Sequence, residues 1–260
     1  MNGWTRLVAI AVAIATAGCG AGSGQGTVSH TRARAARPTT TASPAPRSSV
    51  HRTEIAGRSV LGRPIRVVES GNPAARRSVL VVGCIHGTET AGVAVTRRLI
   101  TARPSRTALL WIIDYVNPDG AAVGARTNAR GVDLNRNFPW RWRPIGSHGD
   151  LQYSGPRPAS ERETRIAMRL IERIRPTVTI WFHQPVRIVR AIGHSVPAAR
   201  WFARLTGLPF RLLPWLSGSA SNWENHRFPA AASFVVELPP GPLSSAAVVR
   251  YVKAVRRLAG

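Results

Sequence analysis

The chain has 260 residues, of which 44% are hydrophobic, and this suits a globular domain with one well-packed core. The formal net charge is +24, and 35 of the 36 basic residues are arginines, the exception being Lys253. Because the arginines are spread along the chain rather than gathered in one basic block, the charge does not favour nucleic-acid binding, and we expect no nucleic-acid partner.

The N-terminus has the pattern of an export signal. Arg6 precedes an apolar run from Leu7 to Ala17, which is too short for an ordinary membrane-spanning helix and typical of a signal-peptide core. The run ends in TAGC at 16–19, similar to a bacterial lipoprotein cleavage box with threonine in place of the usual leucine. We predict a signal peptide over 1–19 and an exported cell-envelope protein. Cys19 would carry the lipid anchor; cleavage without lipid, giving a secreted protein, or an uncleaved anchor are the alternatives.

The next segment differs in composition from the rest of the chain. Residues 20–50 are rich in Pro, Ser, Thr and Arg, with almost no large apolar side chains, and predict a disordered tether. The globular domain is therefore expected over 51–260. Its only cysteine, Cys84, lies in an apolar run and is expected to be a buried thiol, with a disulfide to Cys19 as the less favoured alternative.

Apolar runs and helical patterns alternate through 51–260. The expected elements, in chain order, are a hairpin over 58–70 that turns near 61–63, a buried strand over 78–84, a helix over 90–101, a second buried strand over 108–115, an irregular stretch over 117–159, a helix over 160–175, a strand over 177–182, a helix over 197–206, a strand that opens at 233–236, and a helix over 244–258. Ser160, followed three residues later by Glu163, predicts a capping box. The alternation predicts an α/β fold with a largely parallel sheet covered by helices on both faces.

Chemically active side chains follow three of the predicted strands. In open α/β sheets, sites gather beyond the carboxyl ends of the strands. His86 and Glu89 follow the first buried strand, His183 follows the third, and Glu237 follows the run SFVV. Two histidines and a glutamate form a standard catalytic zinc set that leaves one coordination position open for water. A further glutamate nearby can act as general base.

Each of these features has an ordinary explanation when it is taken alone. A histidine at the end of a strand is more often a satisfied core residue than a ligand, and Glu237 could be half of a buried ion pair. However, an unpaired carboxylate after four core-like residues is costly. The recurrence of such residues at the same kind of position favours a metal site.

Longer motifs join these residues. Together they resemble the zinc carboxypeptidase (M14) family, and the motifs are HGTE at 86–89, RTNARGVDLNRNFP at 126–139, His183 in WFHQP, and Glu237 in FVVELPP. The segment SGPRPASERET at 154–164 and the compact length are most similar to the murein peptide amidase branch. Its bacterial members cut the bond between γ-D-glutamate and diaminopimelate in peptidoglycan peptides. The resemblance implies a single-domain, three-layer zinc-carboxypeptidase-like α/β fold with a mostly parallel or mixed central sheet.

The resemblance also implies a role for each site residue. These roles are one zinc ion per chain on His86, Glu89 and His183, Glu237 as general base, Arg126 as the group that stabilises the oxyanion, and Asn135 with Arg136 as the binding site for the substrate carboxylate. The guanidinium fork of Arg136 suits a carboxylate on chemical grounds as well. Asp133 is expected to orient the loop. Asn128 and Arg130 either line the site or brace the turn.

One segment departs from the family pattern. Carboxypeptidases of the family carry a substrate-contacting tyrosine between the third zinc ligand and the glutamate base, whereas residues 184–236 contain none. Within this segment Glu224 could meet the extra ammonium of diaminopimelate, and the simpler alternative is a solvated loop acid. The substrate is therefore expected to be a peptide or peptidoglycan fragment. The alternatives are a metallocarboxypeptidase or N-acyl amino acid hydrolase of the same fold, or an inactive cationic protein that binds the cell wall.

Overall fold

The computed structural model describes residues 49–260. The predicted signal peptide, Cys19 and tether residues 20–48 therefore lie outside the described residues. The first strand, β1, begins at Val50, one residue before the predicted start of the domain. None of the helices found between residues 49 and 260 is long and apolar enough to cross a membrane.

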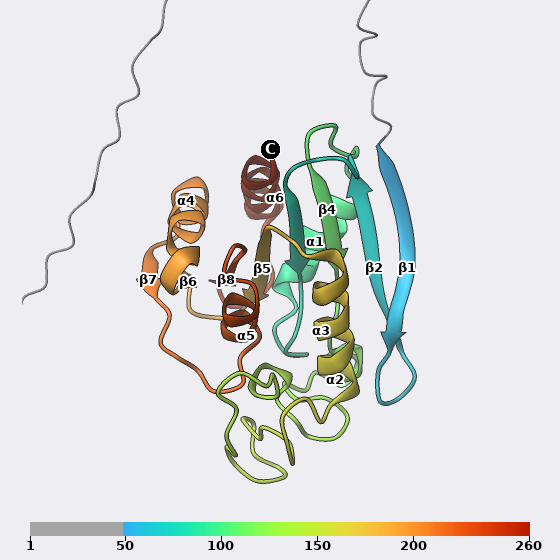
Figure 1. Cartoon of the computed structure of the whole chain (residues 1–260), viewed down its shortest axis with the longest axis vertical. Coiled ribbons are helices and arrows are strands. Elements are labelled where there is room, and N and C mark those ends of the chain that lie inside the picture. The colour runs from blue at the N-terminus through green and yellow to red at the C-terminus, as the bar shows by residue number, and fades with distance from the viewer. Residues whose placement is uncertain (1–48) are drawn as a thin grey trace, which may run out of the picture. The chain divides into compact units, whose positions relative to one another are not determined.

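One mixed sheet organises the described part of the chain. Its eight strands lie in the order β1-β2-β4-β3-β5-β8-β6-β7 (Figure 1). Their bounds are β1 Val50–Arg58, β2 Pro64–Gly71, β3 Ser78–Val82, β4 Leu109–Ile113, β5 Val178–His183, β6 Ile188–Ala191, β7 Phe210–Leu212 and β8 Ala232–Glu237. The four central strands β4, β3, β5 and β8 are parallel, whereas β1, β2 and β4 pair antiparallel, as do β6 and β8. The predicted α/β fold with a mostly parallel or mixed sheet is confirmed.

Helices cover both faces of this sheet. The helices are α1 Ala91–Ile100, α2 Pro118–Val123, α3 Arg162–Ile174, α4 Val196–Thr206, α5 Ala220–Arg227 and α6 Ser245–Ala259, with short 3-10 turns at Leu134–Arg136 and Gly193–Ser195. Along β3, Val79 and Val81 belong to the core cluster that contains side chains of α1, α4 and α6, whereas Leu80 and Val82 belong to the cluster that contains side chains of α3 and α5. In Figure 1 the second pair of helices lies in front of the strands and α6 lies behind them. Alternating side chains of one apolar strand thus build two cores, which gives the three layers.

Four elements were not predicted from the sequence. Helix α2 lies within 117–159, which was expected to be irregular, and the other three have no clear signal. The strands β6 and β7 have only four and three residues, too few for a recognisable period. Helix α5, with the sequence ASNWENHR, has no apolar stripe, because polar and apolar residues alike are buried from Ala220 to Asn225. Amphipathic periodicity detects a helix with one solvated face, so it does not detect α5.

The predicted capping box at the start of α3 is wrong. The helix begins at Arg162, and its N-cap residue, Glu161, makes no side-chain capping hydrogen bond. Ser160 Oγ accepts from Asn137 Nδ2 at 2.9 Å, and Glu163 Oε1 accepts from the backbone N–H of Val60 at 2.9 Å. These side chains therefore form tertiary contacts, with Glu163 holding the turn of the β1–β2 hairpin against the helix.

Candidate functional site

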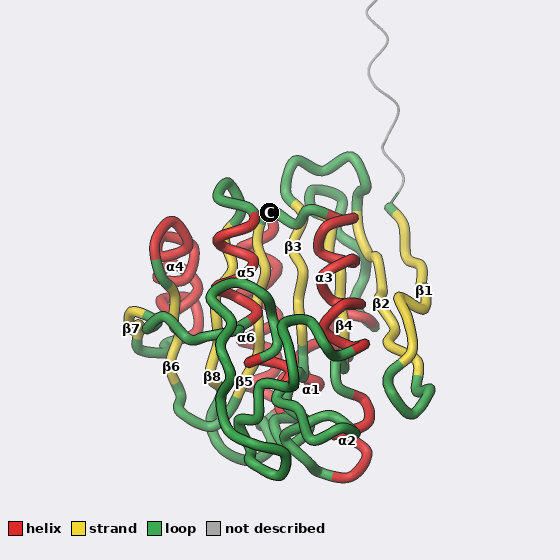
Figure 2. The backbone as a smooth tube through the Cα atoms, turned by 60° about the horizontal axis from the view of Figure 1, so that its bottom comes forward, coloured by secondary structure: helices red, strands yellow, loops and turns green. Residues whose placement is uncertain are grey.

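The site lies at the carboxyl edge of the parallel strands. His183 is the last residue of β5 and Glu237 the last residue of β8, and the two are paired in the register of these strands. His86 and Glu89 follow β3 in the loop that leads to α1. This edge is at the bottom of Figure 1, where Figure 2 shows most of the long loops gathered. The fold thus brings together four residues that are far apart in the sequence.

Three of these side chains converge on one point. Nδ1 of His86 lies 2.9 Å from Glu89 Oε1, Nδ1 of His183 lies 2.8 Å from Glu89 Oε2, and the two Nδ1 atoms are 3.2 Å apart. All three residues are buried. Ligand atoms about 2.0–2.1 Å from a tetrahedral zinc lie roughly 3.3 Å from one another, so the cluster fits a zinc ion. Two imidazole nitrogens turned toward each other also favour a shared cation.

Asp133 fixes the orientation of the first histidine. Its Oδ1 accepts from Nε2 of His86 at 3.0 Å, which places the proton on Nε2 and leaves the Nδ1 lone pair free for a metal. Burial favours the neutral acid, but His86 and then Arg126 outweigh it and hold the pKa of Asp133 well below its usual range. Asp133 Oδ1 also accepts from the backbone N–H of Asn135 at 2.9 Å. Asp133 therefore orients the loop, as predicted, and in addition orients His86, which the sequence did not reveal.

Arg126 lies beside the metal-ligand cluster. It donates to Glu89 Oε1 at 2.9 Å through NH1 and to Asp133 Oδ2 at 3.0 Å through NH2. Each of these nitrogens carries a second hydrogen that the ion pairs do not use. The location agrees with the predicted role in stabilising an oxyanion, which stays a prediction. Burial favours the neutral acid, but His183 and His86 beside Glu89 outweigh it and hold the pKa of Glu89 below its usual range.

Asn135 and Arg136 have different surroundings. Asn135 is buried, its Oδ1 accepts from the backbone N–H of Ala220 at 2.9 Å, and its Nδ2 lies 3.5 Å from Nε2 of His183. Arg136 donates to the carbonyl oxygen of Asn135 at 2.9 Å and forms no ion pair with any residue between 49 and 260. Burial lowers the pKa of Arg136, and Asp133 opposes the shift. Arg136 thus has no acidic partner of its own, whereas Asn135 also contacts α5 and His183. The predicted role of both residues in binding a substrate carboxylate stays a prediction.

Glu237 is the carboxylate without a partner. Its Oε2 is buried and has no hydrogen-bond partner among the described residues. Burial raises the pKa of Glu237, and the neighbouring His183 opposes the shift. The alternative of a buried ion pair is wrong for the described chain, since no basic side chain lies within ion-pair distance. A buried polar atom without a partner destabilises a fold, so Glu237 is the strongest candidate for a chemical role.

Glu224 does not have either of the roles considered for it. It lies on α5 and is 1% exposed, so it is neither a solvated loop acid nor a group facing substrate. Its carboxyl group accepts hydrogen bonds from Thr179 Oγ1, from Trp181 Nε1 at 3.3 Å and from Ser233 Oγ at 2.7 Å. Burial raises the pKa of Glu224 to about 7. Glu224 joins α5 to β5 and β8 inside the core.

Three further residues near the site have structural roles. Asn128 Oδ1 accepts from the backbone N–H of Arg130 at 3.0 Å, and its Nδ2 donates to Glu161 at 2.8 Å, so Asn128 braces the turn. Cys84 is a buried free thiol, as predicted, and burial followed by the charge of Glu89 raises its pKa to about 12. Gln184 donates its backbone N–H to Glu89 at 3.2 Å, a contact for which only its position after His183 is a signal.

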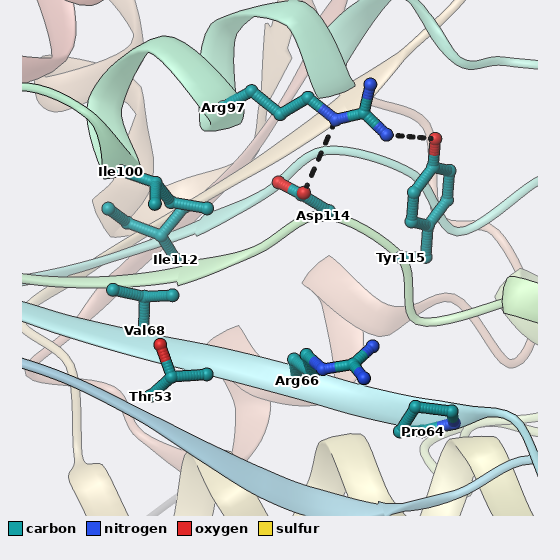
Figure 3. Close-up of a pocket in the computed structure, with 9 residues that line it drawn as sticks. All are labelled: Thr53, Pro64, Arg66, Val68, Arg97, Ile100, Ile112, Asp114 and Tyr115. Carbon is teal, nitrogen blue, oxygen red and sulfur yellow. Dashed lines mark hydrogen bonds and ion pairs between the residues drawn. The ribbon is translucent and has the colours of Figure 1, made fainter.

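A cavity lies away from this cluster. It has a volume of about 360 Å³ and is lined by side chains from α1, β1, β2 and β4 and by Asp114 and Tyr115 after β4 (Figure 3). Arg97 is one of the lining residues. Its Nε lies 3.7 Å from Oδ2 of Asp114, and its NH2 donates to the Tyr115 hydroxyl at 3.5 Å. The cavity contains none of the predicted site residues, so it is not the catalytic cleft.

A three-layer α/β fold with a buried His–Glu–His cluster and a free carboxylate beside it defines a single-zinc hydrolase. The profile of the zinc carboxypeptidase family matches residues 44–189. The chain belongs to the zinc carboxypeptidase (M14) family and is a zinc-dependent peptidase.

Curated relatives and solved structures agree with this assignment. Murein peptide amidase A of Escherichia coli (strain K12) is 34% identical over 168 residues, which is 60% of this chain and 69% of the relative. The Vibrio campbellii protein of the same name is 31% identical over 197 residues, which is 71% of this chain and 78% of the relative. The crystal structure of murein-tripeptide amidase from Escherichia coli O157 matches 80% of this chain and 92% of its own chain, with 30% identity and a TM-score of 0.66.

Proposed function

We propose that this protein is a murein peptide amidase that hydrolyses the bond between γ-D-glutamate and diaminopimelate in peptidoglycan peptides. The observation that carries the hydrolytic chemistry is the unpartnered Oε2 of Glu237 beside the His86–Glu89–His183 cluster. The substrate class is supported by the relatives named murein peptide amidase A and by Arg136, which has no acidic partner in residues 49–260.

The residues of the site divide the reaction among them. Arg136 holds the free carboxylate of diaminopimelate and so positions the neighbouring amide. Glu237 takes a proton from the attacking water as its oxygen bonds to the carbonyl carbon. The same glutamate then passes that proton to the leaving amine as the C–N bond breaks. The free N–H groups of Arg126 face the negative charge that develops on the carbonyl oxygen. A zinc ion held by His86, Glu89 and His183 would supply Lewis acidity toward the water and the carbonyl oxygen.

Another member of the same reaction class is the nearest alternative. A metallocarboxypeptidase or an N-acyl amino acid hydrolase would use the same cluster and Glu237, and Arg136 would bind its terminal carboxylate in the same way. The absence of tyrosine from residues 184–236 argues against an ordinary carboxypeptidase. An inactive wall-binding protein has no use for a buried, unpartnered carboxylate at a metal cluster, so the structure argues against this alternative.

Mass spectrometry of a defined peptide tests the proposal. Zinc-loaded protein is incubated with L-Ala-γ-D-Glu-diaminopimelate, and the expected result is release of free diaminopimelate, absent with the Glu237→Gln variant. Parallel reactions contain peptides that end in ordinary amino acids and N-acyl amino acids. Cleavage of these alone, with the tripeptide intact, would transfer the assignment to one of the alternatives.

We further propose that the protein acts in the cell envelope, anchored through lipid on Cys19. The support is the sequence of the first 19 residues, with Arg6, the apolar run and TAGC. In a bacterial host, the wild-type protein should sediment with membranes, and its N-terminal peptide should carry acyl chains on Cys19. The Cys19→Ala variant should lack the acyl chains. An unmodified Cys19 in mature wild-type protein would refute the anchor.

A further inference from the structure

A cavity of about 320 Å³ lies between two loops, one that follows Arg136 and one that precedes α5. We name it the tryptophan–arginine pocket, and its lining residues are Trp140, Arg141, Arg143, Trp215, Leu216 and Ser217. The two indole rings have centroids 4.6 Å apart. The guanidinium carbon of Arg141 lies 4.8 Å from the ring centroid of Trp140 and 5.4 Å from that of Trp215. The pocket therefore combines apolar walls with a stacked cation.

The positive charge of the pocket is not neutralised. Neither Arg141 nor Arg143 forms an ion pair with a residue in the described part of the chain. The Arg141 guanidinium lies within cation–π distance of both indoles, and its N–H groups donate to no described residue, so they remain available for hydrogen bonds. In the cavity of Figure 3, by contrast, Asp114 already pairs with Arg97. The tryptophan–arginine pocket thus suits an anionic group, and above all a planar carboxylate.

The pocket is built next to the backbone of Arg136. Ser217 Oγ accepts from the backbone N–H of Arg143 and donates to the carbonyl oxygen of Arg141, both at 3.0 Å, and so joins the two loops. The next residue, Gly218, accepts from the backbone N–H of Phe138 at 2.9 Å. Gly218 has a φ of +63°, and a Cβ there would clash with the carbonyl oxygen of Arg136. Ser217, which lines the pocket, is therefore followed directly in the chain by a residue that lies against the backbone of Arg136.

We propose that this pocket binds the second carboxylate of diaminopimelate, at the distal end of its side chain, while Arg136 binds the first. The inference rests on the proposed function, because it concerns the same substrate. Diaminopimelate carries carboxylates at both ends of a short methylene chain that spans roughly two extended residues. The indoles of Trp140 and Trp215 provide apolar surface for the methylenes, and Arg141 and Arg143 provide donors for the distal carboxylate.

The pocket would also select against lysine. A lysine side chain ends in an ammonium group without a carboxylate, so Arg141 and Arg143 would repel it. In diaminopimelate, the distal carboxylate offsets the charge of the distal ammonium. Discrimination of this kind combines an attraction for one ligand with a repulsion of its competitor.

Three substrates test the inference. They are L-Ala-γ-D-Glu tripeptides that end in diaminopimelate, in diaminopimelate with an amidated distal carboxylate, or in lysine. We expect the wild-type protein to prefer diaminopimelate to the other two by roughly 10- to 100-fold in kcat/KM, as for a charged hydrogen-bonded pair. In the Arg141→Gln/Arg143→Gln double variant this preference should collapse toward one, mainly through a higher KM for diaminopimelate.

Two further variants separate recognition from loop structure. Arg143→Gln alone removes a charge without removing the stacked Arg141, and it should lower the preference part of the way. Arg157→Gln removes an exposed arginine outside the pocket and should keep the wild-type preference. A double variant that keeps the wild-type preference would overturn the inference and leave the proposed function intact. Failure of the wild-type protein to cleave any of the three peptides would overturn both.

Discussion

Glu224, which is buried, and Glu237, which is half-buried with one buried oxygen, differ in how well the fold satisfies them. Glu224 receives hydrogen bonds from Thr179, Trp181 and Ser233 and so joins a helix to two strands. Glu237, at the end of β8, has a buried oxygen with no partner between residues 49 and 260. A carboxylate with all its partners stabilises structure, whereas one without them is available to a substrate or a water. The number of partners, rather than burial alone, distinguishes the structural acid from the catalytic candidate.

The surroundings of Glu224 and the metal-ligand cluster lie next to each other along strand β5. Thr179, Trp181 and His183 alternate along β5 and therefore project from the same face of the sheet. The first two contact Glu224 in the core, and the third joins the cluster at the edge. If the comparison holds, substitutions at the metal-ligand cluster should change zinc binding and turnover, whereas substitutions around Glu224 should change the stability of the fold.

The largest effect is expected from removal of a ligand. His183→Ala leaves His86 and Glu89 as the only protein ligands of the cluster, so we expect loss of bound zinc and no measurable cleavage of the tripeptide. Metal analysis by mass spectrometry after gel filtration, together with the cleavage assay, checks this. Full zinc content with normal turnover in the variant would exclude His183 as a ligand.

A smaller effect is expected from Asp133→Asn. The amide can no longer provide a negative partner for Nε2 of His86, so zinc affinity should fall by about 10- to 100-fold. Competition with a chelator of known affinity measures the change. If the zinc affinity is unchanged, Asp133 serves only the loop and the ion pair with Arg126.

The substitution Glu224→Gln should change stability rather than turnover. The raised pKa of about 7 means that the folded protein holds a proton on Glu224 that the unfolded chain loses near the ordinary glutamate pKa of 4.5. Stability from this group is therefore greatest below about pH 4.5 and falls as the pH rises through about 7, by about 3 kcal/mol in all. Urea unfolding between pH 5 and 8 should show a smaller loss of stability in the variant than in the wild type, with kcat unchanged. An identical pH dependence would mean that Glu224 is ionised in the fold.

The smallest effect is expected at Cys84. Its pKa of about 12 and its burial mean that the thiol is neither a thiolate nor accessible at pH 8. Iodoacetamide should leave it unmodified in the native protein and alkylate it after unfolding, as read by peptide mapping. Rapid native alkylation would show an opening near His86 that the structure lacks.

The sequence predicted the parts of the site that depend on strand ends. A continuous apolar run followed by a histidine or glutamate is visible in one dimension, and parallel strands then bring these ends to one edge. His86, His183 and Glu237 were located in this way, with Glu89 beside the first. The position of Arg136 in a long polar loop was likewise visible before the fold.

Other features depend on contacts that no local pattern encodes. The polar residues of α5 are buried because β5 and β8 offer them partners. The helix therefore has no apolar stripe and was not predicted, and Glu224 was expected in a loop rather than in the core. Ser160 and Glu163 have the spacing of a capping box, but their tertiary partners compete successfully for them. Asp133 was assigned to its loop because its second partner, His86, lies 47 positions away in the sequence.

The most direct test of the central claim is to measure zinc content and tripeptide cleavage together in Glu237→Gln. The variant removes the carboxylate that has no structural partner, so we expect one zinc ion per chain, a wild-type melting temperature, and turnover lowered by about 10²- to 10⁴-fold. Turnover close to the wild-type value in a zinc-loaded, folded variant would contradict the account, because Glu237 would then not carry the proton.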